Sequence, residues 1–133
     1  MIELSTLTGA CLVALGERTA GLFSNDKDLS KRIKKMGKKV GEPFWKLPIP
    51  DEIKEGIKNE ASDVINSTRK RYGGASEAAA FLELFVEKGV KWAHLDIAGP
   101  ASASTPFGNY SKGCTGFGVG VLMQHFREMD QSK

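Results

Sequence analysis

Apolar residues recur at helical spacing most clearly between residues 26 and 40. They fall four, three and four positions apart, so they share one face of a helix, while seven lysines and arginines occupy its other faces. These apolar positions are Leu29, Ile33, Met36 and Val40. We predict a helix that Asp26 or Asn25 caps and Gly41 ends, because short polar side chains satisfy the first turn and glycine suits the C-terminal turn.

Three later stretches also follow a helical pattern. One begins at Asp51, with Ile53 and Ile57 facing inward. A second opens at Ser76 or Gly74 and ends at Gly89; its predicted apolar stripe is Ala78, Phe81, Leu82, Phe85 and Val86, with Glu77, Glu83 and Glu87 facing out. The last helix follows Gly118, and its predicted apolar side is Val119, Leu122, Met123, Phe126 and Met129.

Short apolar runs at 1–4, 19–23 and 90–97 predict strands. The run 90–97 is almost continuously apolar, which suits a central strand covered on both faces. The run 9–15 is apolar all round and stops at Gly16, so we predict a buried helical turn or short helix there.

The segment from 41 to 50 contains three prolines, which predict a break in regular structure. Its apolar residues Trp45, Leu47 and Ile49 alternate, so we expect an extended path that packs on the core. Strands that alternate with helices predict a single α/β domain, a layered sheet flanked by helices.

The composition is that of a globular protein. A chain of 133 residues with 41% hydrophobic residues can bury a core, and a net charge of +3, concentrated in residues 27–39, is too small and local to indicate a nucleic-acid partner. The two cysteines, Cys11 and Cys114, are too few for a disulfide framework and indicate a reducing compartment with inert buried thiols. We see no basic-then-apolar leader and no apolar run of the ~20 residues that cross a bilayer, so we expect a cytoplasmic protein without a membrane.

Small residues follow two of the predicted strands, where a backbone can approach a ligand. The first such segment is Thr6-Leu7-Thr8-Gly9-Ala10, and the second contains Ala98 and Gly99. From spacing alone, each is either a tight turn or a binding segment.

Other chemistry-bearing groups have plainer explanations. His94 and Asp96 lie two apart on one strand and face the same way. They could be two metal ligands, but no third ligand has useful spacing, so we favour a buried hydrogen bond between them. The basic cluster 69–71 is either an anion contact or a solvated loop, and the glycines of 113–118 lack the order and the lysine of a phosphate-binding loop.

Six segments, in this order, resemble the C-terminal part of the catalytic domain of cytosolic leucyl aminopeptidases, across nearly the whole chain. They read TLTGA, AGLFSNDKDL, WKLP, EAAAFL, WAHLDIAG and GCTGFGV. The resemblance implies that residues 1–133 are a partial copy of that domain, from a cytoplasmic, hexameric enzyme that releases N-terminal amino acids, leucine preferred, from peptides with two divalent metal ions, zinc or manganese.

The resemblance also assigns substrate contacts. The backbone of Leu7 and Gly9 would hold the substrate's main chain, Thr6 would border its side-chain pocket, and Ala98 would shape the pocket for the first residue. Thr8 would support the turn. The family's metal-ligand segment, Asn-Thr-Asp-Ala-Glu-Gly-Arg, does not occur in the sequence. We therefore expect no catalytic residue, no metal ligand and no bound metal in this chain, and no activity from it alone.

An alternative remains. The chain could be a truncated, non-catalytic relative that acts as an interaction or nucleic-acid-binding module, and the lysine-rich face of the helix predicted at 26–40 would support that hypothesis.

Overall fold

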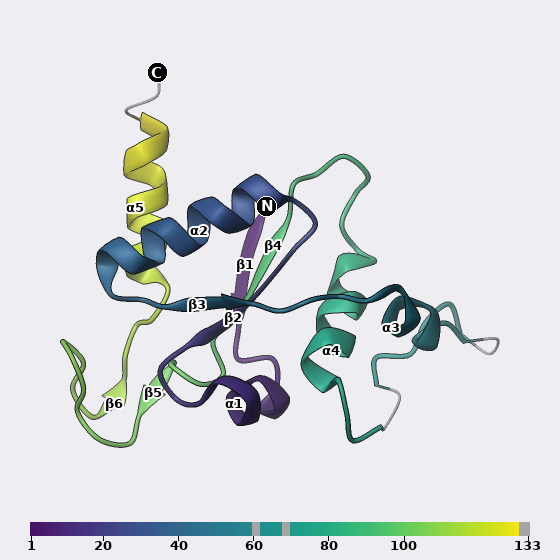
Figure 1. Ribbon diagram of the computed structural model, residues 1–133, viewed down its shortest axis with the longest axis horizontal. Helices are drawn as coiled ribbons and strands as arrows, with labels where there is room; N and C mark the ends of the chain where they lie inside the picture. The colour runs from purple at the N-terminus through teal and green to yellow at the C-terminus, as the bar shows by residue number, and fades with distance from the viewer. Residues whose placement is uncertain (60–61, 68–69, 131–133) are drawn as a thin grey trace.

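The computed structural model describes residues 1–59, 62–67 and 70–130. A four-stranded mixed sheet forms its centre (Figure 1), in the order β1 (Ile2–Ser5), β4 (Ala93–Asp96), β2 (Ala20–Ser24) and β3 (Phe44–Lys46). β1 runs parallel to β4, β4 antiparallel to β2, and β2 parallel to β3. The strand predicted at 90–97 is therefore central, as its apolar sequence indicated.

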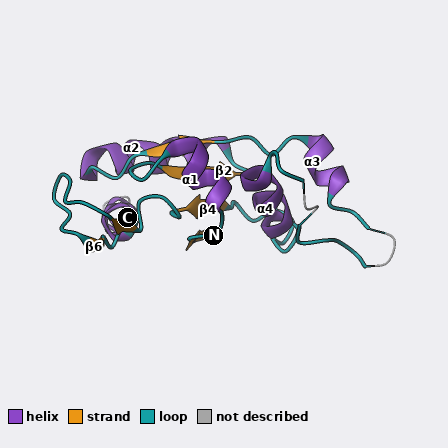
Figure 2. Ribbon diagram, turned by 90° about the horizontal axis from the view of Figure 1, so that it is seen from below, coloured by secondary structure: helices purple, strands orange, loops and turns teal. Residues whose placement is uncertain are grey.

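The described residues form five helices: α1 (Gly9–Leu15), α2 (Lys27–Val40), α3 (Asp51–Gly56), α4 (Gly74–Glu83) and α5 (Val119–Asp130). In Figures 1 and 2, α5 lies toward one end of the molecule and α3 and α4 toward the other. A two-stranded hairpin, β5 (Ser102–Ala103) with β6 (Gly113–Cys114), precedes α5. The predicted class, an α/β sheet flanked by helices, is confirmed.

Helix α2 forms as its sequence pattern predicts. Asp26 caps it by accepting a hydrogen bond from the Leu29 amide at 2.6 Å, and Gly41 ends it in the left-handed conformation. Its apolar face is buried against one side of the sheet.

The two faces of the sheet differ. We call the first the α2 face; its buried residues, with those of α2, α5 and the preceding turn, are Ala20, Leu22, Leu29, Ile33, Met36, Phe44, Ala93, Leu95, Phe117 and Val121. We call the opposite one the α1 face; its strand residues include Glu3, Ser5, Phe23, His94 and Asp96, and α1 and α4 pack there through Cys11, Ala75 and Ala79.

The prediction for α4 is correct only in part: Leu82 and Val86 pack against the core of the α1 face as expected, but other positions differ. The helix ends at Glu83, before Phe85, which is exposed, and it buries alanines together with Glu77, which we expected to face out. Small residues allow a close approach between helices, since a Cβ atom built on Gly74 would lie 3.3 Å from the Cβ atom of Ala10. The phenylalanines cannot pack that closely.

The proline-rich segment is more regular than predicted. Residues 44–46 form β3, because the prolines flank the strand without interrupting it. Phe44 is buried in the α2 face and Trp45 is exposed, so the prediction that Trp45 packs on the core is wrong. Leu47 and Ile49 pack on the core of the α1 face, as expected.

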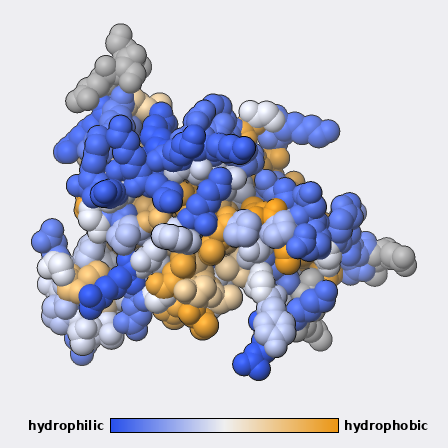
Figure 3. All heavy atoms as spheres, in the orientation of Figure 1, coloured by the Kyte–Doolittle hydropathy of each residue, from blue (hydrophilic) through white to orange (hydrophobic). Residues whose placement is uncertain are grey.

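Apolar side chains remain exposed on α1 and α5. The prediction that residues 9–15 are buried is wrong except at Cys11: Val13 is 88% exposed, because only one face of this short helix meets the sheet. Figure 3 shows hydrophobic residues gathered over α1 and hydrophilic ones over α2. On α5, Val119, Met123, Phe126 and Met129 are exposed. Within the described residues, no helix combines the length and hydropathy that spanning a membrane requires.

Candidate functional site

The two candidate segments leave the sheet side by side. Ser5, the last residue of β1, pairs with Asp96, the last residue of β4, and the Ile97 amide donates to the Ser5 carbonyl at 2.9 Å. Because the strands are parallel, the segments 6–9 and 97–99 both begin at their carboxyl ends.

The carboxylate of Asp96 joins these segments. Its Oδ1 atom accepts hydrogen bonds from the amides of Leu7 at 3.2 Å and Ala98 at 3.1 Å. Its Oδ2 atom accepts one from the Thr8 hydroxyl at 2.7 Å. Asp96 is fully buried, so these three bonds compensate for the loss of water around a charge.

Thr8 supports the turn, as predicted. Its hydroxyl oxygen accepts a hydrogen bond from the Cys11 amide at 3.0 Å and so caps α1, while its proton goes to Asp96. A single side chain thus connects the start of the helix to the end of β4.

The residues assigned to the substrate lie around this turn. Thr6, Leu7 and Gly9 are exposed and Ala98 is half-buried. The structure brings the backbone of Leu7 and Ala98 together through Asp96, and it leaves open space where a Cβ atom of Gly9 would stand. Their contact with a substrate stays a prediction.

Gly99 has a structural reason to be small. A Cβ atom there would collide with the carbonyl oxygen of Gly16, at the end of α1. The absence of a side chain at this position therefore serves packing between two backbones.

The predicted hydrogen bond between His94 and Asp96 is wrong, because the backbone amides and Thr8 take the carboxylate. The Nδ1 atom of His94 instead lies 3.2 Å from Glu3 Oε1 on β1, without the alignment of a hydrogen bond. The ring stacks between Phe23 and Trp92, with centroids 5.9 and 6.4 Å away. Burial lowers the pKa of His94, which the carboxylates of Glu3 and Asp96 partly offset, so the ring is neutral at pH 7.

The two cysteines differ. Burial, and then the nearby Asp96 carboxylate, raise the pKa of Cys11 to about 11, so its thiol is inert as expected. Cys114 is exposed, which contradicts the prediction that it is buried.

The donor groups near the candidate site do not fit a metal centre. The lone pairs of Asp96 point to two amides and a hydroxyl, and His94 faces a single carboxylate. Across residues 1–59, 62–67 and 70–130, no three or more His, Cys, Asp or Glu side chains gather closely enough to hold a metal ion.

Sequence reasoning missed the role of Glu42. This buried carboxylate accepts hydrogen bonds from the amides of Gly118 at 3.0 Å, Gly120 at 3.2 Å and Val121 at 2.8 Å. It therefore caps α5, whose sequence offers no Ser, Thr, Asp or Asn at its start. That missing cap was the available sequence signal, and the glycine-rich stretch 113–118 is a structural turn. Of the basic cluster, residue 69 lies outside the described residues, and Lys70 and Arg71 are exposed.

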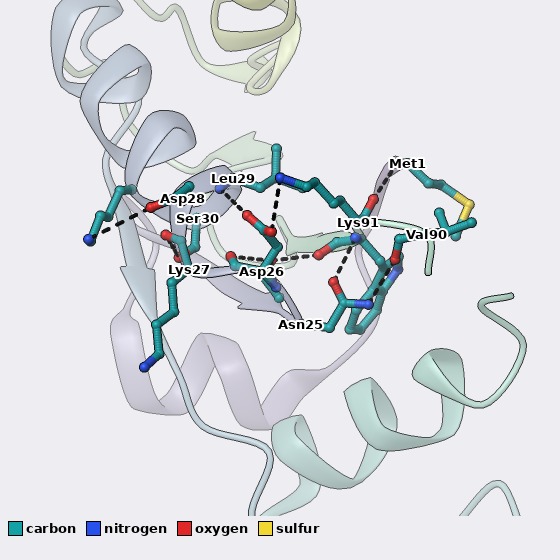
Figure 4. A network of polar contacts seen from close by, with 12 residues as sticks. Met1, Asn25, Asp26, Lys27, Asp28, Leu29, Ser30, Val90 and Lys91 are labelled. Carbon is teal, nitrogen blue, oxygen red and sulfur yellow. Dashed lines mark hydrogen bonds and ion pairs between the residues drawn. The ribbon is translucent and has the colours of Figure 1, made fainter. Parts of the chain in front are cut away.

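A second polar network closes the other end of the sheet (Figure 4). The N-terminal ammonium group donates to the Lys91 carbonyl at 2.6 Å, and Asn25 bonds the backbone of Val90 and Trp92. Asp26 contacts Lys91 at 3.3 Å and caps α2. These contacts hold strand starts and loops in place, far from the segments 6–9 and 97–99 in the register of the sheet.

Relatives of known sequence match almost the whole chain. The chain is 52% identical, over 99% of its length, to a probable cytosol aminopeptidase of Aquifex aeolicus (strain VF5), and covers 27% of that protein. It is 50% identical, over 96% of its length, to a probable cytosol aminopeptidase of Chloroherpeton thalassium (strain ATCC 35110 / GB-78), of which it covers 25%. The chain thus spans about a quarter of the length of these relatives.

Solved structures share the fold. The bottromycin maturation enzyme BotP superposes with a TM-score of 0.92 at 35% identity, covering 98% of this chain and 29% of that one, and the same enzyme in complex with Mn gives 0.91 at 36% identity. A mutant of tomato leucine aminopeptidase gives 0.85 at 38% identity, covering 92% and 23%. The family model for the cytosol aminopeptidase family, catalytic domain, matches residues 1–123. The chain therefore belongs to the cytosol aminopeptidase family and carries part of its catalytic domain.

Proposed function

We propose that this chain forms the substrate-holding part of a metal-dependent aminopeptidase that releases N-terminal amino acids, leucine preferred, from peptides. The observation that carries the proposal is the parallel pairing of β1 and β4, which places the segments 6–9 and 97–99 next to each other at one edge of the sheet.

Each segment has a distinct part in this proposal. The amide of Leu7 bonds to Asp96, so the group that Leu7 offers a peptide is its carbonyl oxygen, with the Gly9 backbone beside it. Gly9 lets a ligand approach closely because nothing stands where its side chain would be. Thr6 borders the pocket for the first residue of the peptide, and Ala98 forms its small wall.

The metal ions of such an enzyme, zinc or manganese, would be held by residues of the full-length protein that this chain does not contain, since the described donor groups do not fit them. We extend the proposal to a homohexamer that works in the cytoplasm, as the family resemblance implies. The relatives are named as aminopeptidases, so we do not favour the alternative of a non-catalytic interaction or nucleic-acid-binding module.

A chimera tests the proposal. Residues 1–133 replace the matching quarter of the Aquifex aeolicus relative, and hydrolysis of leucine p-nitroanilide is measured with Mn²⁺ and with Zn²⁺. We expect turnover by the chimera and none above the blank by the 133-residue chain. A folded chimera without activity, beside an active unmodified relative, would refute the proposal, and turnover by the chain alone would refute the assignment of the metal ions to other residues.

The pocket wall is tested in the same chimera. Ala98→Phe should lower kcat/KM for leucine p-nitroanilide at least tenfold, about 1.4 kcal/mol, because the added ring occupies the pocket for the first residue. Ala14→Phe, at an exposed position of α1, serves as the matched control and should leave kcat/KM unchanged. Equal kinetics for Ala98→Phe and the wild-type chimera, with large and small substrates alike, would remove Ala98 from the site.

A further inference from the structure

The buried carboxylate of Asp96 accepts hydrogen bonds from the turn and the strand end that we assign to the substrate. These donors are the Leu7 amide, the Thr8 hydroxyl and the Ala98 amide. Oδ1 bonds both backbone segments at once, so it extends their connection past the last bond of the strand ladder, from the Ile97 amide to the Ser5 carbonyl.

Thr8 extends this link into α1. Because its hydroxyl donates to Oδ2 and accepts from the Cys11 amide, its orientation is fixed from both sides. A carboxylate only accepts hydrogen bonds, and both of its oxygens are used by the three donors that converge on it here.

A buried charge is costly unless donors compensate for it. The donors here are Leu7 and Thr8, which lie 89 and 88 positions earlier in the chain, and Ala98. Loss of the carboxylate would leave these donors without their acceptor and remove the link between the two segments beyond the strand ladder.

We propose that Asp96 is a positioning residue of the aminopeptidase: it fixes the spacing between the backbone that holds the peptide, at 6–9, and the pocket wall at Ala98. This inference rests on the proposed function. Asp96 touches no substrate in this assignment, so its loss weakens substrate binding more than it slows the chemical step.

The first test uses the active chimera. Asp96→Ala, which removes the acceptor oxygens, should raise KM for leucine p-nitroanilide at least tenfold while kcat changes less than threefold. Thr8→Val, which keeps the shape and loses the hydroxyl, should do the same, whereas Thr8→Ser should restore KM to within twofold of wild type. Asp26→Ala is the matched control, because that carboxylate also accepts a backbone amide but lies at the other end of the sheet (Figure 4). It removes the cap of α2, so it should lower Tm and leave KM unchanged.

The second test needs no activity and uses the 133-residue chain carrying Phe126→Ser, which we expect to reduce association. Amide hydrogen exchange followed by NMR should show Leu7 and Ala98 exchanging at least tenfold faster when Asp96→Ala removes their acceptor. Asp26→Ala should cause no such change and should accelerate Leu29 instead. Thr8→Val should also accelerate Leu7, so the test survives if Asp96→Ala fails to fold.

The outcomes separate the two proposals. A wild-type chimera without activity refutes the proposed function, and the exchange rates then still decide whether Asp96 couples the segments. Three results would each overturn the positioning role: an active chimera in which Asp96→Ala leaves KM unchanged, equal KM values for Thr8→Ser and Thr8→Val, or unchanged exchange at Leu7 and Ala98 in Asp96→Ala.

Discussion

On the α2 face the sheet presents Leu22, Phe44 and Leu95 to two amphipathic helices, whereas on the α1 face it presents His94 and Asp96 to short, alanine-rich ones. The first face is stabilised by contact between large apolar side chains, whose burial is worth roughly 1.5–3 kcal/mol each. The second contains charged and titratable groups that burial alone would penalise.

The difference shows how one strand can serve two purposes. Alternate residues of β4 point to opposite faces, so Ala93 and Leu95 build the core while His94 and Asp96 reach toward β1 and the turn after it. We infer that the α2 face supplies most of the stability and that the α1 face sets the geometry of the candidate site.

The largest expected effect on stability lies on the α2 face. Leu95→Ala should lower the free energy of unfolding by about 3 kcal/mol, because it leaves a cavity between the sheet and α2 that the neighbours cannot fill. Urea denaturation followed by circular dichroism measures it. Leu12→Ala, at a partly exposed position of α1, is the matched control and should cost less than about 1 kcal/mol; an equal cost for both would contradict the division between the faces.

Variants of the buried carboxylate of Glu42 should change the stability of the chain without changing substrate binding. Glu42→Ala should lower the free energy of unfolding by about 2 kcal/mol, because three amides at the start of α5 lose their acceptor. Glu42→Gln, which keeps one acceptor oxygen, should cost about half as much. In the chimera, KM should not change for either Glu42 variant, in contrast to Asp96→Ala. A raised KM would mean that α5 also shapes the site.

Elements governed by local pattern could be predicted from the sequence. Helix α2 has both a cap and an unbroken apolar stripe, and β4 has an apolar run that suits only a covered strand, so neighbouring residues contain the information. The buried positions of α4 could be predicted only in part in this way. Its phenylalanines indicated one buried face, but the close approach to α1 favours the alanines.

At the candidate site, too, local pattern could be predicted from the sequence and contacts between distant residues could not. The small residues after β1 and β4 indicated two binding segments, and the structure places them together. The bonds that hold them connect residues 88 and 89 positions apart, and nothing in the spacing of His94 and Asp96 shows that the carboxylate would turn to backbone amides rather than to the imidazole. A buried acidic residue at the end of a strand indicates that hydrogen-bond donors compensate for its charge, but it does not indicate which residues supply them.

The pH dependence of stability gives a smaller effect that is specific to the α1 face. The pKa of His94 is lowered from 6.5 in the folded chain, mainly by burial and against the opposing influence of Glu3 and Asp96. The unfolded chain therefore binds a proton at pH values where the folded ring does not, so this contribution is complete above pH 6.5 and is lost as the pH falls below it.

Denaturant titrations at a series of pH values measure this effect. His94→Gln should make stability fall less steeply than in wild type as the pH decreases below 6.5. His125→Gln, at a half-buried position on α5 whose pKa is lowered by burial and by Arg32, should change the slope less. A wild-type slope in His94→Gln would show that this ring does not titrate with unfolding.

Substitutions in the exposed apolar surface of α5 should have the smallest effect on stability and the clearest effect on assembly. On α5, Val119, Met123, Phe126 and Met129 form an exposed stripe, and an apolar stripe of this kind favours association. We expect the isolated chain to be oligomeric or prone to aggregate.

Phe126→Ser should reduce association while the free energy of unfolding stays within about 0.5 kcal/mol of wild type. Phe85→Ser removes a phenylalanine of similar exposure that lies outside the stripe, so it should leave association unchanged. Size-exclusion chromatography with light scattering measures both variants, and a wild-type monomer near 14.4 kDa that persists at high concentration would contradict the expectation.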